Sequence, residues 1–395
     1  MRLTPAGELT RRITALQKLL QQKGVDGALI VDSADMFYFA GTAHRAHLFI
    51  PAEGKPLLMV KRSFTRAQGE SALEDIVPLA NVKDLTKMLN VYGYNNITTL
   101  GLELDVLPAA LYLLFQKLFE GAQIVDISGL IRSVRMVKSS FELEVLRDAA
   151  QLNYTLFSRV KDYLKEGITE LELAGQLEMV YRLAGHSGTV KMRGFDQEVY
   201  YGHVLSGTNG AIPSCMESPT GGLGVSISFP QGAGYKKIAR NEPVMIDFVG
   251  VKDGYLADQT RIFCIGQLPD KLVHAHETAL LIQEAVKQMA VPGALCEDIY
   301  WYAINMAAES GYGEHFMGYS EPVPFIGHGI GIELNEWPVL ALGFKTPLEK
   351  NMVIAIEPKF IFPEGAVGIE NTFVVGEKGL ETLTLFDENI LYVKQ

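Results

Sequence analysis

The sequence has few cysteines, and their arrangement limits the kinds of protein it can form. Its 395 residues include 3 cysteines, Cys215, Cys264 and Cys296, and no two of them have CxxC spacing. An odd number of scattered cysteines is typical of reduced thiols and argues against a disulfide framework. The first residues, MRLTPAGELTRRI, contain no apolar core like that of a signal peptide. We therefore expect a cytoplasmic protein.

Positive charge and long apolar runs are also lacking. The formal net charge is −11, which disfavours nucleic acid and anionic membranes as partners. No apolar run is long enough to span a bilayer. Glycines are frequent between residues 202 and 241, but the phosphate-loop motif G-x-x-x-x-G-K-[ST] is absent. The hydrophobic content of 48% and charged content of 21% are typical of a globular protein.

The length of the chain predicts two domains. Helical and strand patterns alternate in residues 1–136, which predicts an α/β domain. Within it, the apolar runs 48–50 and 57–60 flank Glu53-Gly54-Lys55 and predict a hairpin. The aromatic run 37–39 predicts the start of another strand. The loop residues 44–47 contain two of the eight histidines.

The second domain should begin at residue 137. Ser139 with Glu142 and Thr169 with Glu172 have capping-box spacing, so each pair predicts a helix start. A helix–helix–strand order is predicted for residues 142–204 and again for residues 271–332. This pattern indicates a weak internal repeat.

Two aspartates mark the most informative stretch, residues 247–261 (DFVGVKDGYLADQTR). Asp247 interrupts an apolar run, Asp253-Gly254 favours a tight turn, and Asp258 lies on the returning segment. The pattern predicts a hairpin that brings Asp247 and Asp258 side by side. Two adjacent buried carboxylates repel each other, and a metal ion is the simplest cation that offsets the repulsion.

Three downstream residues extend this candidate metal site. His328 lies in a glycine-rich segment, Glu357 ends an apolar strand, and Glu370 lies in a similar context. One imidazole and four carboxylates suit two hard or borderline divalent cations that are bridged by carboxylates. We expect manganese, with cobalt, zinc and iron as the alternatives.

With these segments the chain resembles the pita-bread metallohydrolases, the family of aminopeptidase P, prolidase, methionine aminopeptidase and creatinase. It is most similar to the Xaa-Pro peptidase-like members. The matching segments are 247–261, 327–338, 356–358 and 369–372, and the similarity extends to a creatinase/prolidase-type N-terminal domain.

The resemblance implies an α+β protein. Residues 1–136 would form a smaller α/β domain. Residues 137–395 would form the pita-bread domain, a curved antiparallel sheet with helices on its outer face. The resemblance also implies a homodimer, in which a loop such as 44–47 reaches a partner's cleft.

The chain departs from this family around the expected metal site. Where the peptidases usually have histidines, it has Ser214, Pro324 and Asn335, and their usual arginine is replaced by Gly368. Serine and asparagine form hydrogen bonds but do not titrate near neutral pH. We therefore expect Ser214 and Asn335 to bind substrate.

Two further features bear on the missing histidines. His203 lies in the same region as Ser214 and is a candidate for a catalytic role, with a structural role as the alternative. The glycine-rich segment 217–237 is close in sequence to Asp247. It is either an active-site loop or a plain surface loop.

Three functions remain open. The first is a two-metal hydrolase of an amide or related C–N bond, Xaa-Pro aminopeptidase-like or prolidase-like, in which Glu357 takes up the proton of the attacking water. The second is a metal-dependent enzyme with a small non-peptide substrate, which the missing histidines favour. The third is a non-catalytic binding protein, which the presence of all five ligands disfavours.

Overall fold

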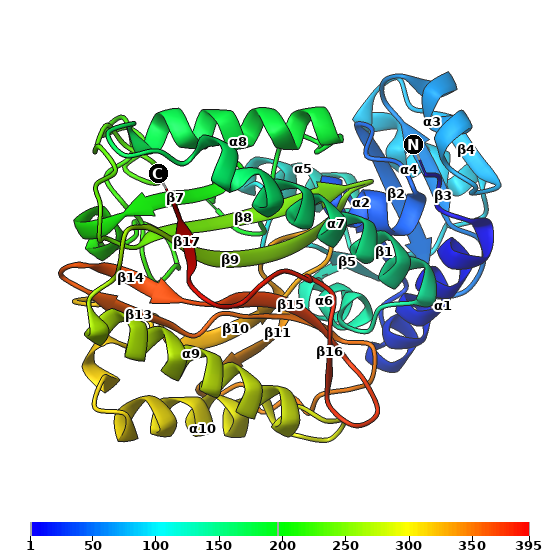
Figure 1. Cartoon of the computed structure of the whole chain (residues 1–395). Helices are drawn as coiled ribbons and strands as arrows, with labels where there is room; N and C mark the ends of the chain where they lie inside the picture. The colour runs from blue at the N-terminus through cyan, green and yellow to red at the C-terminus, as the bar shows by residue number, and fades with distance from the viewer. Residues whose placement is uncertain (1, 196, 395) are drawn as a thin grey trace. The chain divides into compact units, whose positions relative to one another are not determined.

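A computed structural model describes residues 2–195 and 197–394. The chain divides into two compact units (Figure 1). Unit 1 contains Met1–Arg135 and Arg193–Asp196, and unit 2 contains Met136–Met192 and Gln197–Gln395. Of the helices in the described ranges, none has the length and apolar character needed to cross a membrane.

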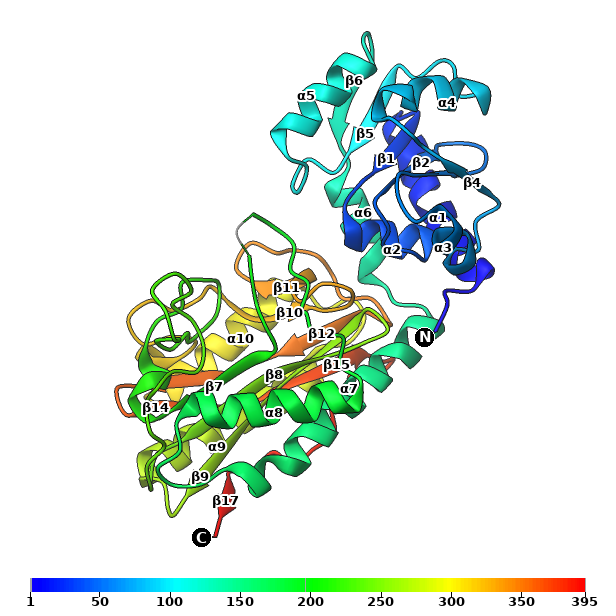
Figure 2. The same ribbon diagram turned by 90° about the horizontal axis from the view of Figure 1, so that it is seen from above.

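Unit 1 is built on a six-stranded sheet with the order β4-β3-β2-β1-β5-β6 (Figure 2). The strands are β1 (Gly27–Ile30), β2 (Ala46–Pro51), β3 (Leu57–Val60), β4 (Asp75–Pro78), β5 (Thr99–Leu102) and β6 (Gln123–Asp126). The pairs β1–β2 and β2–β3 are antiparallel, and the other pairs are parallel. The helices are α1 (Ala6–Lys23), α2 (Ser33–Ala40), α3 (Phe64–Glu70), α4 (Leu85–Val91), α5 (Ala109–Leu118) and α6 (Ser128–Met136).

One local prediction for unit 1 is confirmed and one is wrong. The predicted hairpin is formed by β2 and β3. The predicted strand at residues 37–39 is instead part of α2. The reason is a local cap, because the Asp32 carboxylate accepts hydrogen bonds from the backbone N–H groups of Ala34 and Asp35 and starts a helix there.

Unit 2 contains a nine-stranded sheet whose main path is β11-β10-β12-β15-β9-β8-β7. The strands are β7 (Gly202–Ser206), β8 (Val244–Lys252), β9 (Tyr255–Ile265), β10 (Phe325–Gly329), β11 (Glu336–Ala341), β12 (Val353–Ile356), β15 (Glu370–Val375), β16 (Leu380–Thr382) and β17 (Leu391–Val393). A separate hairpin is formed by β13 (Lys359–Phe362) and β14 (Gly365–Gly368).

Four long helices accompany this sheet: α7 (Ser140–Tyr163), α8 (Glu170–Ala184), α9 (Asp270–Met289) and α10 (Cys296–Glu309). The two predicted capping boxes are present. Ser139 and Glu142 cap α7, and Thr169 and Glu172 cap α8. Such caps contribute about 1 kcal/mol each.

The helices cover the sheet in two halves, with α7 and α8 beside β7–β9 and with α9 and α10 beside the other strands (Figure 1). Val244, Ile246 and Phe248 of β8 belong to the core with α7 and α8. Because side chains alternate along a strand, Asp247 lies on the opposite face.

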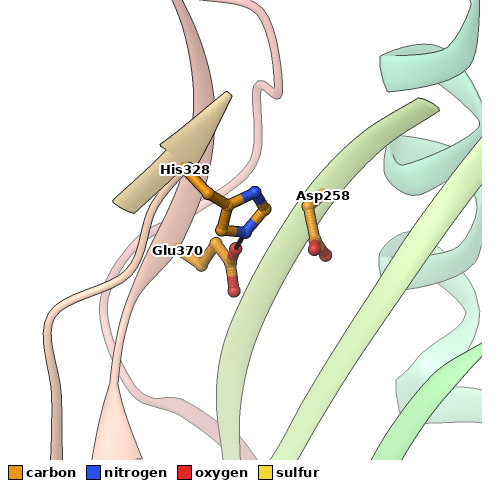
Figure 3. Close-up of side chains that lie close together, drawn as sticks. All are labelled: Asp258, His328 and Glu370. Carbon is orange, nitrogen blue, oxygen red and sulfur yellow. Dashed lines mark ion pairs between the residues drawn. The ribbon is translucent and has the colours of Figure 1, made fainter. Parts of the chain in front are cut away.

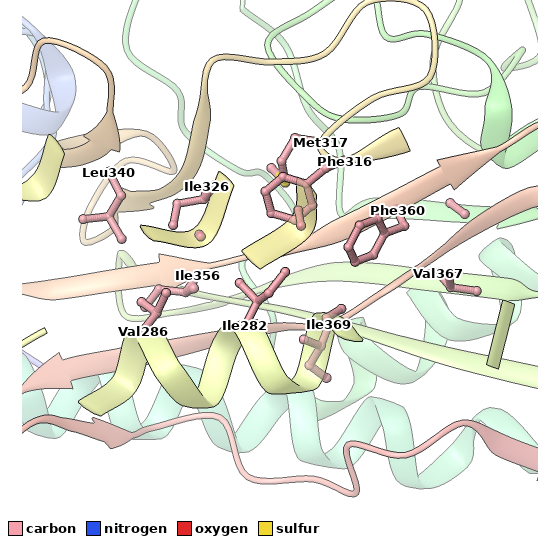
Figure 4. Close-up of a cluster of buried hydrophobic side chains, with 14 of the residues drawn as sticks. Ile282, Val286, Phe316, Met317, Ile326, Leu340, Ile356, Phe360, Val367 and Ile369 are labelled. Carbon is pink, nitrogen blue, oxygen red and sulfur yellow. The ribbon is translucent and has the colours of Figure 1, made fainter. Parts of the chain in front are cut away.

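In the half of the sheet under α9 and α10, apolar side chains again face the helices. Ile356 and Ile369 pack with Ile282 and Val286 of α9 (Figure 4). Glu370, the neighbour of Ile369, therefore faces away from that core. The packing of apolar residues under the helices leaves the opposite face of the sheet to polar and charged side chains.

His47 provides a test of folding in unit 1. It lies within β2 and is 9% exposed, so it is not part of a loop as the sequence predicted. Its Nδ1 has no hydrogen-bond partner among the described residues. Burial lowers the pKa of His47 to about 4, and Lys61 and Arg45 act in the same direction.

We expect His47 to make the fold sensitive to acid. An unfolded histidine has a pKa of about 6.5, so between about pH 6.5 and 4 the unfolded chain binds more protons than the folded chain. Stability should fall across this window as the pH decreases, by on the order of 3 kcal/mol. Urea unfolding of wild type and His47→Leu at several pH values measures this difference. His274→Leu, at an exposed position on α9, is the control. Parallel pH profiles for wild type and His47→Leu would contradict the prediction.

Candidate metal centre

The strand registers place the predicted site residues in two neighbouring rows across the large sheet. In the first row, His203 of β7 pairs with Asp247 of β8, Asp247 pairs with Thr260 of β9, and Thr260 pairs with Glu370 of β15. Paired residues share a face of the sheet. Four neighbouring strands therefore contribute one polar side chain each to this row.

The second row crosses the sheet at Asp258 of β9. Asp258 is two positions before Thr260 on β9, so both side chains share a face. The backbone N–H of Asp258 donates to Thr372 Oγ1 at 2.9 Å. Thr372 pairs with Ala355, and Ala355 pairs with His328. This row brings His328 to the same face as Asp258.

Glu357 is positioned by the end of β12. Its backbone N–H donates to Ile326 O at 3.0 Å, directly after the last β12 residue, Ile356. Its Oε1 lies 3.6 Å from His328 Nε2. All five predicted metal ligands therefore lie on one face of the sheet.

A buried arginine joins the two halves of the sheet behind this site. Arg261 Nη1 donates to the backbone oxygens of Thr260 at 2.8 Å and Glu370 at 2.9 Å. Burial lowers the pKa of Arg261 to about 10, so the guanidinium remains charged at neutral pH. It links β9 to β15 at the paired residues Thr260 and Glu370.

Asp258, His328 and Glu370 form the best-defined group of potential ligands (Figure 3). Their ligand atoms all lie within 4.8 Å of one another. His328 Nδ1 is 3.1 Å from the backbone oxygen of Gly329, which assigns the proton to that nitrogen and leaves the Nε2 lone pair facing the site. Glu370 Oε1 lies 3.9 Å from this Nε2 and has no hydrogen-bond partner among the described residues.

These three residues fit a divalent ion. An imidazole nitrogen and carboxylate oxygens are donors that manganese, iron, cobalt and zinc accept. A buried carboxylate oxygen without a hydrogen bond is costly unless a cation approaches it. The unpartnered Glu370 Oε1 therefore supports an ion at this position.

A lysine occupies the other side of the cluster. Lys359 Nζ lies 3.0 Å from Asp247 Oδ2, 2.7 Å from Glu357 Oε2 and 2.8 Å from Glu370 Oε2. It is 1% exposed. Burial acts to lower the pKa of Lys359, but the three carboxylates raise it well above its usual value.

The carboxylates respond differently to this lysine. Burial acts to raise the pKa of Asp247, but Lys359 and His203 hold it below its usual value. Burial and the charge of Asp247 raise the pKa of Asp258 well above its usual value, and burial and Asp258 do the same for Glu370. Lys359 thus keeps the pKa of Asp247 low, whereas at Asp258 and at Glu370, which it contacts, burial and like charge outweigh its effect.

The cluster opens into a small cavity of about 60 Å³, which has room for a few water molecules. Its lining includes His203, Asn335 and Glu357. Gln231, from the glycine-rich segment, also lines it. That segment therefore contributes to the cavity and is more than a surface loop.

Gln231 connects Ser214 to His203. The N–H of Met216 donates to Ser214 Oγ at 2.9 Å, so the Ser214 hydroxyl is free to donate to Gln231 Oε1 at 2.9 Å. This bond orients the Gln231 amide, whose Nε2 lies 3.2 Å from His203 Nε2 and donates to it. Burial lowers the pKa of His203, although Asp247 opposes the shift.

The predicted site residues thus have different positions. The five metal-ligand candidates, His203 and Asn335 lie at the cavity, whereas Ser214 bonds to Gln231, which lines it. Lys359 and Gln231 were missed by the sequence reasoning. A signal for Lys359 exists in IAIEPKFIF, where a lysine interrupts an apolar run two residues after Glu357. No comparable local signal marks Gln231.

Comparison with known proteins agrees with this architecture. Residues 144–377 match Metallopeptidase family M24, and residues 12–137 match the Creatinase/Prolidase N-terminal domain. The Xaa-Pro dipeptidase of Pyrococcus furiosus is 25% identical over 386 residues, which are 97% of this chain and 100% of that protein.

Two solved structures extend the similarity to three dimensions. Xaa-Pro dipeptidase from Bacillus anthracis has a TM-score of 0.84 at 25% identity, over 98% of this chain and 100% of that one. X-Pro aminopeptidase from Thermotoga maritima has a TM-score of 0.79 at 27% identity, over 96% and 99% of the two chains.

The fold and the site define a metallohydrolase with a creatinase-type N-terminal domain and a C-terminal pita-bread domain. The chain belongs to metallopeptidase family M24. The predicted family, fold class and enzyme class are confirmed, and membership implies divalent metal.

Metal removal should destabilise the protein. A ligand that binds only the folded state stabilises it by about 2.7 kcal/mol at a concentration of about 100 times Kd. We expect chelation to lower the melting temperature and added Mn²⁺ to restore it, as measured by differential scanning fluorimetry. His328→Asn should lose this response. His315→Asn, outside the cavity, should keep it. Equal melting temperatures with and without metal in wild type would contradict the prediction.

Proposed function

We propose that this protein is a metal-dependent hydrolase of an amide or related C–N bond, and that its substrates are small peptides with an Xaa-Pro bond. The observation that carries the proposal is the convergence of Asp258, His328 and Glu370 at one cavity in a chain of family M24. The similarity over nearly the whole chain to a protein named Xaa-Pro dipeptidase supports the substrate class.

Each cavity residue has a chemical role in this proposal. A divalent ion held by the three ligands would supply Lewis-acid polarisation. Glu357 is the proton acceptor, because Lys359 engages its Oε2 and leaves Oε1 on the side of His328. Asn335 offers an amide for hydrogen bonds to a substrate. His203 contributes an imidazole that Gln231 holds in place.

The roles predicted for Ser214 and for the metal remain proposals. The Ser214 hydroxyl acts on the cavity through Gln231, so a direct contact with substrate requires a change in that bond. Manganese is the proposed ion, with cobalt, zinc and iron as alternatives that the donor set also accepts. The prediction of two ions rests on five ligands. Lys359 argues against the second ion, because its ammonium group contacts three of these ligands.

A small non-peptide substrate is the second candidate. Ser214 and Asn335 stand where the resembling peptidases usually have histidines, and neither can transfer a proton near neutral pH. The retained ligand set disfavours a non-catalytic binding protein. A homodimer and a cytoplasmic location are also proposals. They rest on the family resemblance, on the cysteine pattern and on the first residues of the sequence.

Kinetic assays on Xaa-Pro dipeptides test the function. We expect Mn²⁺-dependent hydrolysis by wild type that is weak, because general acid–base help typically contributes 10²–10⁴-fold to a rate. Asn335→His restores a titratable group to the cavity and should raise kcat/KM by about 10²-fold. Asn90→His, at an exposed position on α4, is the matched control and should leave it unchanged.

Two outcomes would count against these expectations. High wild-type efficiency with no gain in Asn335→His would show that the missing histidines do not limit the enzyme. Absence of hydrolysis of every Xaa-Pro dipeptide, with turnover of small amidino or N-acyl acids in a parallel panel, would favour the non-peptide substrate.

A further inference from the structure

Lys359 places a protein cation inside the cluster that was predicted to hold two metal ions. An ammonium group has three N–H donors. Each of those of Lys359 meets a different carboxylate, at 3.0 Å for Asp247, 2.7 Å for Glu357 and 2.8 Å for Glu370. All three partners are members of the predicted five-ligand set. The ammonium therefore supplies charge where a metal ion would otherwise supply it.

The distances exclude an ion at the same position. Divalent transition metals bind carboxylate oxygens at about 2.0–2.2 Å. An ion bound to Asp247 Oδ2, Glu357 Oε2 and Glu370 Oε2 would occupy the space among these oxygens, which already contains Lys359 Nζ. Two cations in that space would also repel each other strongly, because Lys359, Glu357 and Glu370 are buried.

The remaining ligand atoms suit one ion. Lys359 contacts the Oε2 atoms of Glu357 and Glu370, and their Oε1 atoms lie 3.6 Å and 3.9 Å from His328 Nε2. Asp258 completes this group. Glu370 can therefore bind the ammonium with Oε2 and an ion with Oε1, while Oε1 of Glu357 lies beside His328. The position among Asp258, His328 and Glu370 fits a metal ion, whereas the position of Lys359 Nζ does not.

The backbone of Lys359 is held in place at the edge of the cluster. Its carbonyl accepts the N–H of Met317 at 2.9 Å, and its strand neighbour Phe360 is fully buried. Lys359 pairs with Gly368 across the β13–β14 hairpin. A Cβ atom at Gly368 would lie 2.6 Å from Lys359 Cα and 3.0 Å from its Cγ. The glycine that replaces the usual arginine of the resembling family thus leaves the space that the lysine needs.

We propose that the Lys359 ammonium permanently replaces one of the two expected metal ions, so that the site binds a single divalent ion among Asp258, His328 and Glu370. This inference rests on the proposed function, because it assumes metal dependence. One dication and one ammonium nearly balance the four carboxylates. Lys359 is a positioning residue, since its donors hold carboxylates and none is directed at a substrate.

Metal stoichiometry tests the inference on the full-length protein. Metal-free protein is titrated with Mn²⁺ alone by isothermal calorimetry, and the bound ion is examined by electron paramagnetic resonance. We expect wild type to saturate at one ion per chain, with the hyperfine pattern of isolated Mn²⁺. Lys359→Met, of similar length without charge, should bind a second ion and give the signal of a spin-coupled pair.

Lys138→Met is the matched control, because it removes another buried lysine, whose partner Glu336 lies 2.9 Å away. It should saturate at one ion, as wild type does. Two ions in wild type would overturn this inference and leave the proposed function intact. One ion in both wild type and Lys359→Met would overturn the role of Lys359 as the excluding group. No ion in wild type would overturn the proposed function itself. If Lys359→Met does not fold, the wild-type stoichiometry still decides.

Discussion

Repulsion among four carboxylates, of which three are buried and Asp247 is half-buried, is the constraint on which unit 2 depends. Asp247, Asp258, Glu357 and Glu370 line the same small cavity. Such a cluster stays fully ionised only if cations offset both the repulsion and the loss of hydration. Lys359 supplies one cation from the chain itself. The raised pKa values of Asp258 and Glu370 indicate that the lysine alone is insufficient.

The sheet holds these like charges together against their repulsion. Apolar side chains on one face pack under α7–α10, and the strand registers align the acidic residues on the other face. Arg261 ties β9 to β15 through backbone oxygens at the crossing point between the two halves. Apolar burial on the helix-covered face therefore stabilises an arrangement that would be unfavourable by itself.

A second polar system connects the cavity to the glycine-rich segment. Ser214 orients Gln231, and Gln231 engages His203, whose strand neighbour is Asp247. Ser214 stands where the resembling peptidases usually have a histidine, and the Ser214 hydroxyl and the Gln231 amide form hydrogen bonds but do not titrate near neutral pH. The cavity thus combines hydrogen-bonding side chains with the candidate metal ligands, and Glu357 is the carboxylate that we propose as the proton acceptor.

The sequence by itself determined the elements with local causes. The starts of two helices were predicted from capping boxes, which are formed by residues three apart in sequence. The pairs are Ser139 with Glu142 and Thr169 with Glu172. The Asp253-Gly254 turn likewise predicted the hairpin that carries Asp247 and Asp258. The residues 37–39 were misread because the cap at Asp32 outweighs the strand preference of aromatic residues.

Tertiary structure decided what depends on contacts between distant segments. Lys359 follows Glu357 by two residues in sequence, yet it also binds Asp247, which is 112 positions away. Gln231 and His203 meet across a 28-residue separation that no periodicity predicts. Sequence patterns report which face a residue prefers, whereas strand order and register decide which side chains share a point in space. The number of cations that this cluster can hold is set by that shared geometry.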